Sequence, residues 1–383
     1  VCRKSVNLEI DPPVGLTRFS PADILKKMVN KKEKTMSEYQ VGRIYPSDKR
    51  AITQMDALLK QEGIERDKNL DYMAGLFDDD YNLVATGSCF KNTLRCFAVD
   101  HDHQGEGLLN AIISHLITYE YEKGNMELFL YTKVNSAKFF GDIGFYEIAR
   151  VEDKLVFMEN RKNGFQNYLQ ELANSKQDNG KNGAVVMNAN PFTLGHLYLL
   201  ETAAAACDTL HVFVVEEEAS PIPFAVRYAL VKAGSAHIKN LVYHSSGSYI
   251  ISSATFPSYF LKDSQLVIQS QAKLDLKIFT KIAQALNVTE RFVGEEPFSE
   301  VTSLYNSIMA KELPAAGISC TVIPRKEDAN GPISASKVRL ALKEGRLNDI
   351  RCVVPATTYA YFASSEAEPI LAKLRALKDV IHY

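Results

Sequence analysis

The chain has 383 residues, 46% of them hydrophobic, which is enough for two or three domains with buried cores. Its 44 Lys and Arg residues nearly balance 46 Asp and Glu residues, which argues against nucleic acid or a membrane surface as a partner held by charge. The six cysteines form no CxxC pair and no apolar run approaches the ~18 to 20 residues that span a bilayer, so we expect a cytoplasmic protein with reduced thiols.

The first part of the chain is predicted to be a basic extension followed by an α+β domain. Eleven Lys and Arg against six Asp and Glu residues fall in the first fifty positions, and we interpret residues 1–36 as the extension. Residues 37–160 mix helical and strand periodicity. Their predicted elements are a helix, two strands of a hairpin, a helix and a strand, over residues 52–62, 83–90, 93–99, 108–121 and 127–131.

A glycine-rich loop, Gln104-Gly105-Glu106-Gly107, lies between the hairpin and the next helix. Backbone N–H groups in such a loop can bind a pyrophosphate, and a plain tight turn fits the same residues. His101 and His103 precede the loop, but their spacing and the lack of a third ligand predict no metal site.

A second domain is predicted over residues 183–383, after a helical linker over 161–182. The linker ends in the polar run 177–183, where we place the boundary. Beyond it, buried strands alternate with helices, which predicts a parallel sheet with helices on both faces. These elements are expected over residues 184–187, 197–206, 211–215, 224–233, 241–243 and 290–293.

The strongest local signal is the segment 187–196, MNANPFTLGH, in which a buried strand leads through a proline turn to a helix start with the pattern TxGH. A helix N-terminus at the carboxyl end of a parallel strand offers free N–H groups to phosphate. Gly195 would allow close approach, Thr193 would donate its hydroxyl, and His196 would donate to charge developing on an α-phosphate. An N-capped helix with a surface histidine is the alternative interpretation.

A second anion site is predicted at residues 333–339, ISASKVR, before a helix that stops at Gly345. Two hydroxyls, a lysine and an arginine at a helix start favour an anion, although Ser334 or Ser336 also fits an N-cap. In this order, the two motifs resemble the two signatures of the HxGH-type nucleotidyltransferase superfamily.

Longer strings resemble the citrate lyase ligase family. They cover residues 187–196, 248–260, 275–279, 291–298 and 332–339. The resemblance implies a GNAT-like α+β domain followed by a Rossmann-like parallel-sheet nucleotidyltransferase domain. It also implies an activity: with ATP and Mg²⁺, acetate is converted to acetyl-adenylate and passed to the thiol of a CoA-like prosthetic group on the citrate lyase acyl carrier subunit, releasing AMP and pyrophosphate.

The resemblance also implies roles for individual residues. His196, Thr193 and Arg339 would be catalytic. The nucleotide would be bound by the residues that match the two signatures and the segment after a later strand: Asn188, Asn190, Gly195, Gly294, Glu295, Pro297, Ser334, Ser336 and Lys337. In the GNAT-like domain, Gln104, Gly105 and Gly107 would bind the CoA-like arm.

The chain departs from the family pattern at five positions that usually carry basic residues. Here they are Leu197, Glu216, Pro221, Ser245 and Ser253. Each lost charge-assisted contact to phosphate is worth ~1.5–3 kcal/mol, so the departures predict weaker nucleotide binding. Other basic residues are candidates to compensate, namely Arg227, Lys232, Arg291, Arg325 and Lys326.

Three other functions fit the sequence: an adenylyltransferase acting on a phosphorylated small molecule, a catalytically weakened citrate lyase-binding factor, and an acetyl-CoA-dependent acetyltransferase that uses the first domain. His244 ends a strand and is expected to be an ordinary edge histidine rather than a nucleotide contact. Cys207, Cys320 and Cys352 are expected to be small buried residues, because nothing nearby indicates a reactive thiolate.

Overall fold

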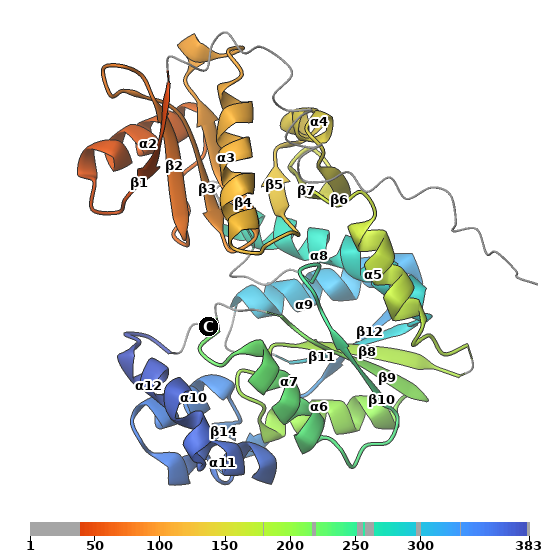
Figure 1. Cartoon of the computed structure of the whole chain (residues 1–383). Helices are drawn as coiled ribbons and strands as arrows, with labels where there is room; N and C mark the ends of the chain where they lie inside the picture. The colour runs from red at the N-terminus through yellow and green to blue at the C-terminus, as the bar shows by residue number, and fades with distance from the viewer. Residues whose placement is uncertain are drawn as a thin grey trace, which may run out of the picture.

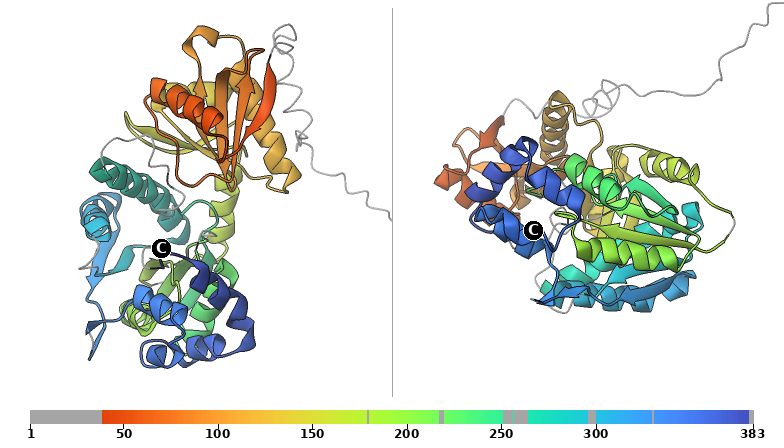
Figure 2. Two further views of the ribbon diagram at one scale, coloured as in Figure 1. Left: turned by 90° about the vertical axis from the view of Figure 1, so that its left-hand side faces the viewer. Right: turned by 90° about the horizontal axis from the view of Figure 1, so that it is seen from below.

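The computed structural model describes residues 39–178, 180–216, 220–250, 256, 264–295, 300–329 and 331–380, without the side chains of 264 and 300–302. The predicted extension, Ser253 and Pro297 lie outside these residues. Two α/β parts are stacked one above the other, each built on its own sheet (Figures 1 and 2). The predicted fold class is confirmed in both parts, which carry a mixed and a parallel sheet, respectively.

The first sheet has seven strands in the order β1-β2-β3-β4-β5-β7-β6. Their bounds are Gln40–Ile44 for β1, Tyr72–Phe77 for β2, Leu83–Phe90 for β3, Thr93–Val99 for β4, Phe129–Thr132 for β5, Tyr146–Val151 for β6 and Leu155–Glu159 for β7. The predicted hairpin is confirmed as β3 and β4. Only β4 and β5 pair in parallel, at Thr93 with Phe129 and Leu94 with Leu130, and they diverge beyond those pairs.

Three helices accompany this sheet: α2 over Lys49–Gln61, α3 over Leu108–Glu122 and α4 over Ala137–Asp142. Helix α3 packs through Ile112 and Leu116 against a face that includes Leu130. Because side chains alternate along a strand, Phe129 and Tyr131 lie on the opposite face. That face belongs to a hydrophobic core shared with the second part of the chain.

The second sheet has five parallel strands in the order β10-β9-β8-β11-β12. The strands are β8 over Asn182–Met187, β9 over Thr209–Val214, β10 over Leu241–Ser245, β11 over Glu290–Gly294 and β12 over Ser319–Ile323. The helices are α6 over Leu194–Ala205, α7 over Phe224–Gly234, α8 over Ser264–Leu286 and α9 over Glu300–Glu312. Residues of α6 and α7 pack in one core and those of α8 and α9 in another, which confirms helices on both faces.

Helices α8 and α5, over Gly164–Ala173, lie where the two parts meet (Figure 1). Helix α8 contacts β6 of the first sheet, and Lys281 Nζ donates to the carbonyl of Ile148 at 2.8 Å. The parts are therefore joined by a packed interface. The domain limits 37–160, 161–182 and 183–383 stay a proposal, and β8 begins at Asn182, inside the proposed linker.

The chain ends in a helical cluster of α10 over Ala335–Lys343, α11 over Ala356–Phe362 and α12 over Glu368–Ala376, preceded by the short strands β13 over Glu327–Asp328 and β14 over Gly331–Pro332. The predicted helix stop is confirmed, since Gly345 has a φ of 73° just beyond α10. Among the helices that the structure describes, none has the length and apolar character to span a bilayer.

Candidate functional site

The carboxyl end of β8 carries buried polar groups without partners. Asn188 Oδ1 and both amide atoms of Asn190 are buried and have no hydrogen-bond partner among the described residues. Asn190 is only 3% exposed, and an unpaired buried polar atom costs ~1–3 kcal/mol. Ala189 between them adopts a φ of 50°, an uncommon conformation that clusters at functional sites. The amides fit a polar ligand at this edge of the sheet.

Helix α6 begins with a capping box built by Thr193 and His196. The Thr193 N–H donates to His196 Nδ1 at 3.1 Å, and Thr193 Oγ1 lies 2.9 Å from the same nitrogen. Since Nδ1 accepts, the neutral ring carries its proton on Nε2. Burial, followed by the positive charges of Arg325 and Arg339, lowers the pKa of His196 to about 4. His196 is therefore a neutral donor at ordinary pH.

The two sequence motifs lie together in space. A side chain added at Gly195 would place its Cβ 3.6 Å from the carbonyl oxygen of Ile333, an ordinary contact distance. Ser334 caps α10, and its Oγ accepts from the N–H of Ser336 at 3.2 Å. The Lys337 side chain is exposed. The starts of α6 and α10 therefore lie next to each other, and Ser334 is the N-cap that the alternative interpretation allowed.

Arg339 lies on α10 and is buried, with 2% exposure. Its guanidinium donates to the carbonyls of Asn190 and Val380, both at 2.6 Å, and to Ser336 Oγ at 3.2 Å. These contacts fix the loop after β8 against α10 and the end of the chain. The geometry favours a positioning role for Arg339 rather than contact with a phosphate.

Arg227 plays a similar part behind the ends of β8 and β9. It is fully buried on α7, and its Nη1 donates to the carbonyls of Asn188 at 2.7 Å and Val215 at 2.8 Å. Its Nε donates to Ile222 at 3.0 Å. One guanidinium therefore holds the ends of two neighbouring strands side by side, a geometry that sequence periodicity does not reveal.

The segment that begins at Gly294, which the resemblance assigns to nucleotide binding, follows β11, and β11 is paired with β8. The N–H of Glu295 donates to the carbonyl of Ile323 at 2.8 Å, and Asn306 Nδ2 donates to the carbonyl of Gly294 at 3.1 Å. Apart from its chain neighbours, no atom of the described residues lies within 4 Å of a Cβ added at Gly294. The segment thus opens at the same edge of the sheet as Asn190.

Two of the departure positions contact each other. Ser245 Oγ donates to a carboxylate oxygen of Glu216 at 2.6 Å, at the ends of β10 and β9. Leu197 is half-buried on α6, Pro221 is buried, and Ser253 is outside the described residues. Among the basic residues proposed to compensate, Arg227 and Arg291 are buried. The charge of Arg325 helps to lower the pKa of His196. Lys232 lies over the ring of Tyr228, and Lys326 lies over the ring of Tyr198.

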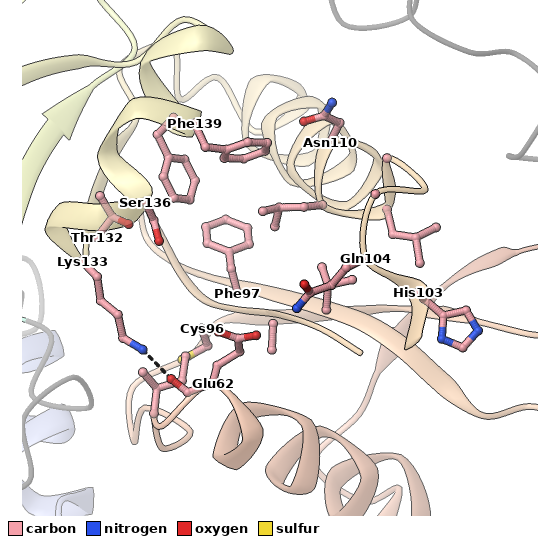
Figure 3. Close-up of a pocket in the computed structure, with 18 of the residues that line it drawn as sticks. Glu62, Cys96, Phe97, His103, Gln104, Asn110, Thr132, Lys133, Ser136 and Phe139 are labelled. Atoms are coloured by element: carbon pink, nitrogen blue, oxygen red, sulfur yellow. Dashed lines mark hydrogen bonds between the residues drawn. The ribbon is translucent and has the colours of Figure 1, made fainter. Parts of the chain in front are cut away.

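The glycine-rich loop of the first domain borders a cavity of about 490 Å³ (Figure 3). Gly105 and Gly107 have φ of 88° and 80°, and nothing lies within 4 Å of a Cβ added at either. Gln104 and Asn110 also line the cavity, and Asn110 Oδ1 is buried without a partner in the described part of the chain. The diverging strands β4 and β5 form its walls.

Several expectations outside these sites have clear outcomes. His244 is buried at the end of β10, and its Nε2 lies 2.9 Å from His211 Nδ1, so it pairs within the sheet. Cys207 and Cys320 are half-buried, and the expectation of buried cysteines is wrong for Cys352, which is exposed because it lies in a loop between α10 and α11.

His101 and His103 lie in a short 3-10 helix. The described residues contain no cluster of three His, Cys, Asp or Glu side chains suited to a metal, and the expectation that these histidines bind none stays a prediction.

Comparisons with known proteins identify the family. A model of the citrate lyase ligase C-terminal domain matches residues 182–362. A citrate pro-3S-lyase ligase from Klebsiella pneumoniae is 39% identical over 319 residues, which are 82% of this chain and 93% of that protein. Its counterpart from Escherichia coli K12 is 37% identical, over 83% of this chain and 92% of that one. This chain belongs to the citrate lyase ligase family. As a citrate lyase ligase it is an enzyme.

Comparison with solved structures gives matches of low sequence identity and low TM-score, each over part of this chain. An acetyltransferase of the GNAT family from Staphylococcus aureus is 11% identical, with 32% of this chain and 99% of that chain covered and a TM-score of 0.28. The ribosomal-protein-S18-alanine N-acetyltransferase from Escherichia coli is 16% identical, with 32% and 92% covered and a TM-score of 0.26.

Proposed function

We propose that this chain uses ATP to acetylate the thiol of the CoA-like prosthetic group on the citrate lyase acyl carrier subunit. The reaction proceeds through acetyl-adenylate and releases AMP and pyrophosphate. The observation that carries the proposal is the unpaired buried amide of Asn190 beside the capping box of Thr193 and His196, in a chain that belongs to the citrate lyase ligase family.

In the first step the acetate carboxylate attacks the α-phosphorus, and the bond to pyrophosphate breaks. Positioning and charge neutralisation supply most of the catalysis in such a transfer. His196 donates from Nε2, and the N–H of Gly195 and the positive end of the α6 dipole face the phosphates. The N–H groups of Leu194 and His196 already donate to the Val353 carbonyl and to Thr193 Oγ1, respectively. Mg²⁺ would supply further charge neutralisation when it enters with ATP.

The remaining site residues bind and orient the nucleotide. Ser334, Ser336 and exposed Lys337 lie at the start of α10, opposite Gly195, and complete the phosphate site. The amides of Asn188 and Asn190 gain partners from the ligand, and Gly294 and Glu295 border the adenosine. Pro297 is assigned to the nucleotide by the family resemblance alone, because it lies outside the described residues. Arg339 holds the loop after β8 in place through its bond to the Asn190 carbonyl.

In the second step the carrier's thiol attacks the acetyl carbonyl carbon, and AMP leaves. The first domain binds the CoA-like arm at Gln104, Gly105 and Gly107, which line the 490 Å³ cavity, and both glycines adopt the left-handed conformation found in loops that bind anions through backbone N–H groups. The room around both glycines and the unpaired Asn110 amide support this assignment.

The proposal is tested by incubating the chain with ATP, Mg²⁺, acetate and the carrier subunit that bears its prosthetic group. We expect one AMP and one pyrophosphate for each acetyl thioester formed, and none without acetate. Pyrophosphate release without acetate would instead identify an adenylyltransferase. Acetylation from acetyl-CoA without ATP would identify an acetyltransferase, and carrier binding without any turnover would identify a binding factor.

A further inference from the structure

A second cavity, of about 390 Å³, lies between the two domains. Its first-domain wall combines the rings of Phe90, Phe129 and Phe157 with polar and charged side chains, namely Asp71, Lys91, Asn92, Thr93, Lys123 and Asn125. Its second-domain wall includes Glu216 and Ser248. Asn92 Nδ2 lies 3.4 Å from Ser248 Oγ across this boundary. The two domains therefore form the walls of this cavity together.

This interdomain cavity adjoins the nucleotide site. Arg227 Nη1 donates to the carbonyl of Asn188 and to the carbonyl of Val215, and Glu216 directly follows Val215. Glu216 also accepts from Ser245, at the end of the next strand. The cavity therefore opens at the carboxyl edge of the parallel sheet, beside the strand end that carries the unpaired asparagine amides.

The interdomain cavity also adjoins the cavity of the glycine-rich loop. Tyr131 lines both. Strands β4 and β5 are paired only as far as Leu94 and Leu130, so no backbone pairing joins these strands beside Tyr131. Tyr131 stacks on Phe157 with ring centroids 4.5 Å apart, on the sheet face opposite α3. A chain-like ligand held at the glycine-rich loop can therefore cross the sheet at Tyr131 and end between the domains.

We propose that the interdomain cavity is the chamber in which the thiol end of the carrier's arm meets acetyl-adenylate, after the arm passes through the opening beside Tyr131. The assignment rests on the proposed function. The ligand class is an extended, thiol-ended chain of amides and methylenes. Aromatic rings suit its methylenes, while the side chains of Asn92, Asn125 and Ser248 offer hydrogen bonds to its amides.

The chemical step in this chamber balances without another reactant. The thiol releases its proton to water, and the thiolate attacks the acetyl carbonyl carbon. A carbon–sulfur bond forms, the bond between that carbon and the phosphate oxygen breaks, and its electron pair leaves with AMP.

Thiol trapping tests where the arm ends. The carrier's arm thiol is first converted to a mixed disulfide with thionitrobenzoate, and the full chain carrying Ser248→Cys is added. Attack by the new thiol releases thionitrobenzoate and forms a covalent complex visible by mass. Ser364→Cys is the matched control, because Ser364 is also exposed but lies after α11, away from both cavities.

We expect Ser248→Cys to form the complex at least tenfold faster than Ser364→Cys. The rate measured with the unchanged chain, whose native cysteines also react, is subtracted as background. Equal rates for the two variants would overturn the chamber. The prosthetic group with its sulfur methylated, which cannot attack the mixed disulfide, is added in excess as a competitor and should slow only the Ser248→Cys reaction.

Filling the cavity is the second test. We expect Ser248→Trp to reduce acetyl transfer to the carrier at least tenfold more than it reduces acetate-dependent exchange between ATP and pyrophosphate, whereas Ser364→Trp changes neither. Equal reduction of both reactions, or no reduction, would overturn the chamber while leaving the proposed function intact. An unchanged chain without exchange or transfer would overturn the proposed function itself, and with it this inference.

Discussion

The neutral state of His196 is the feature of the site that can be checked most directly. Its Nδ1 accepts from Thr193, and burial with Arg325 and Arg339 lowers its pKa to about 4. At pH 5.5 the ring would be about 3% protonated, whereas an ordinary histidine with a pKa near 6.5 would be about 90% protonated. The His196 ring therefore stays neutral until the pH falls to about 4.

The protonation state of His196 can be measured from the histidine ring resonances in the NMR spectrum of the chain. The sequence has eight histidines, and the resonance missing from His196→Gln identifies the ring in question. We expect it to remain in the neutral position from pH 8 to 5, with the proton on Nε2. Circular dichroism at each pH checks that the chain stays folded.

A His196 resonance that titrates near pH 6.5, or a proton on Nδ1, would refute the geometry. The rate of exchange between ATP and pyrophosphate gives a second check. After correction for the ionisation of acetate and ATP, the rate at pH 5.5 should not show the tenfold loss that protonation of an ordinary histidine would cause and that His196→Gln would remove.

Three further predictions concern the support of the site. Asn190→Leu should leave thermal stability unchanged or raised, because its amide has no described partner, while exchange falls at least a hundredfold; a matching loss of stability would contradict this. Arg227→Lys should lose some of its three carbonyl contacts, at ~1–3 kcal/mol for each orphaned acceptor, so the melting temperature should fall and the KM for ATP rise. Burial lowers the pKa of His211 and His244 to about 4, so protonation of the unfolded chain should remove roughly 2 kcal/mol of stability per histidine between pH 7 and 5. Urea unfolding should show that this loss is smaller in the double variant His211→Phe/His244→Phe.

Features set by local sequence were predictable. A proline turn and a threonine cap produced the start of α6, although the helix begins at Leu194 instead of 197 because Thr193 is the cap. The hairpin of β3 and β4 was also found, since its strands are adjacent in the chain. Strands β1, β2, β6, β7 and β12 were not predicted, and neither were α8 and α9, whose places depend on packing between distant segments.

The site was predictable in its residue types but not in its supports. Nothing in the sequence near Arg339 shows that its partners are the carbonyls of Asn190 and Val380. Likewise, the hydrogen bond from Arg227 to the carbonyl of Asn188 joins α7 to the residue after β8, and β9 lies between them in the chain. The interdomain cavity depends on the docking of two sheets, which no local pattern encodes.

The central claim is that the site at the start of α6 forms acetyl-adenylate. Exchange of radiolabelled pyrophosphate into ATP, measured with Mg²⁺ with and without acetate, tests it most directly. We predict exchange that requires acetate and falls by about 10²- to 10³-fold in His196→Ala, the usual loss when one preorganised donor is removed. Exchange without acetate, or exchange unchanged in a folded His196→Ala chain, would contradict the account.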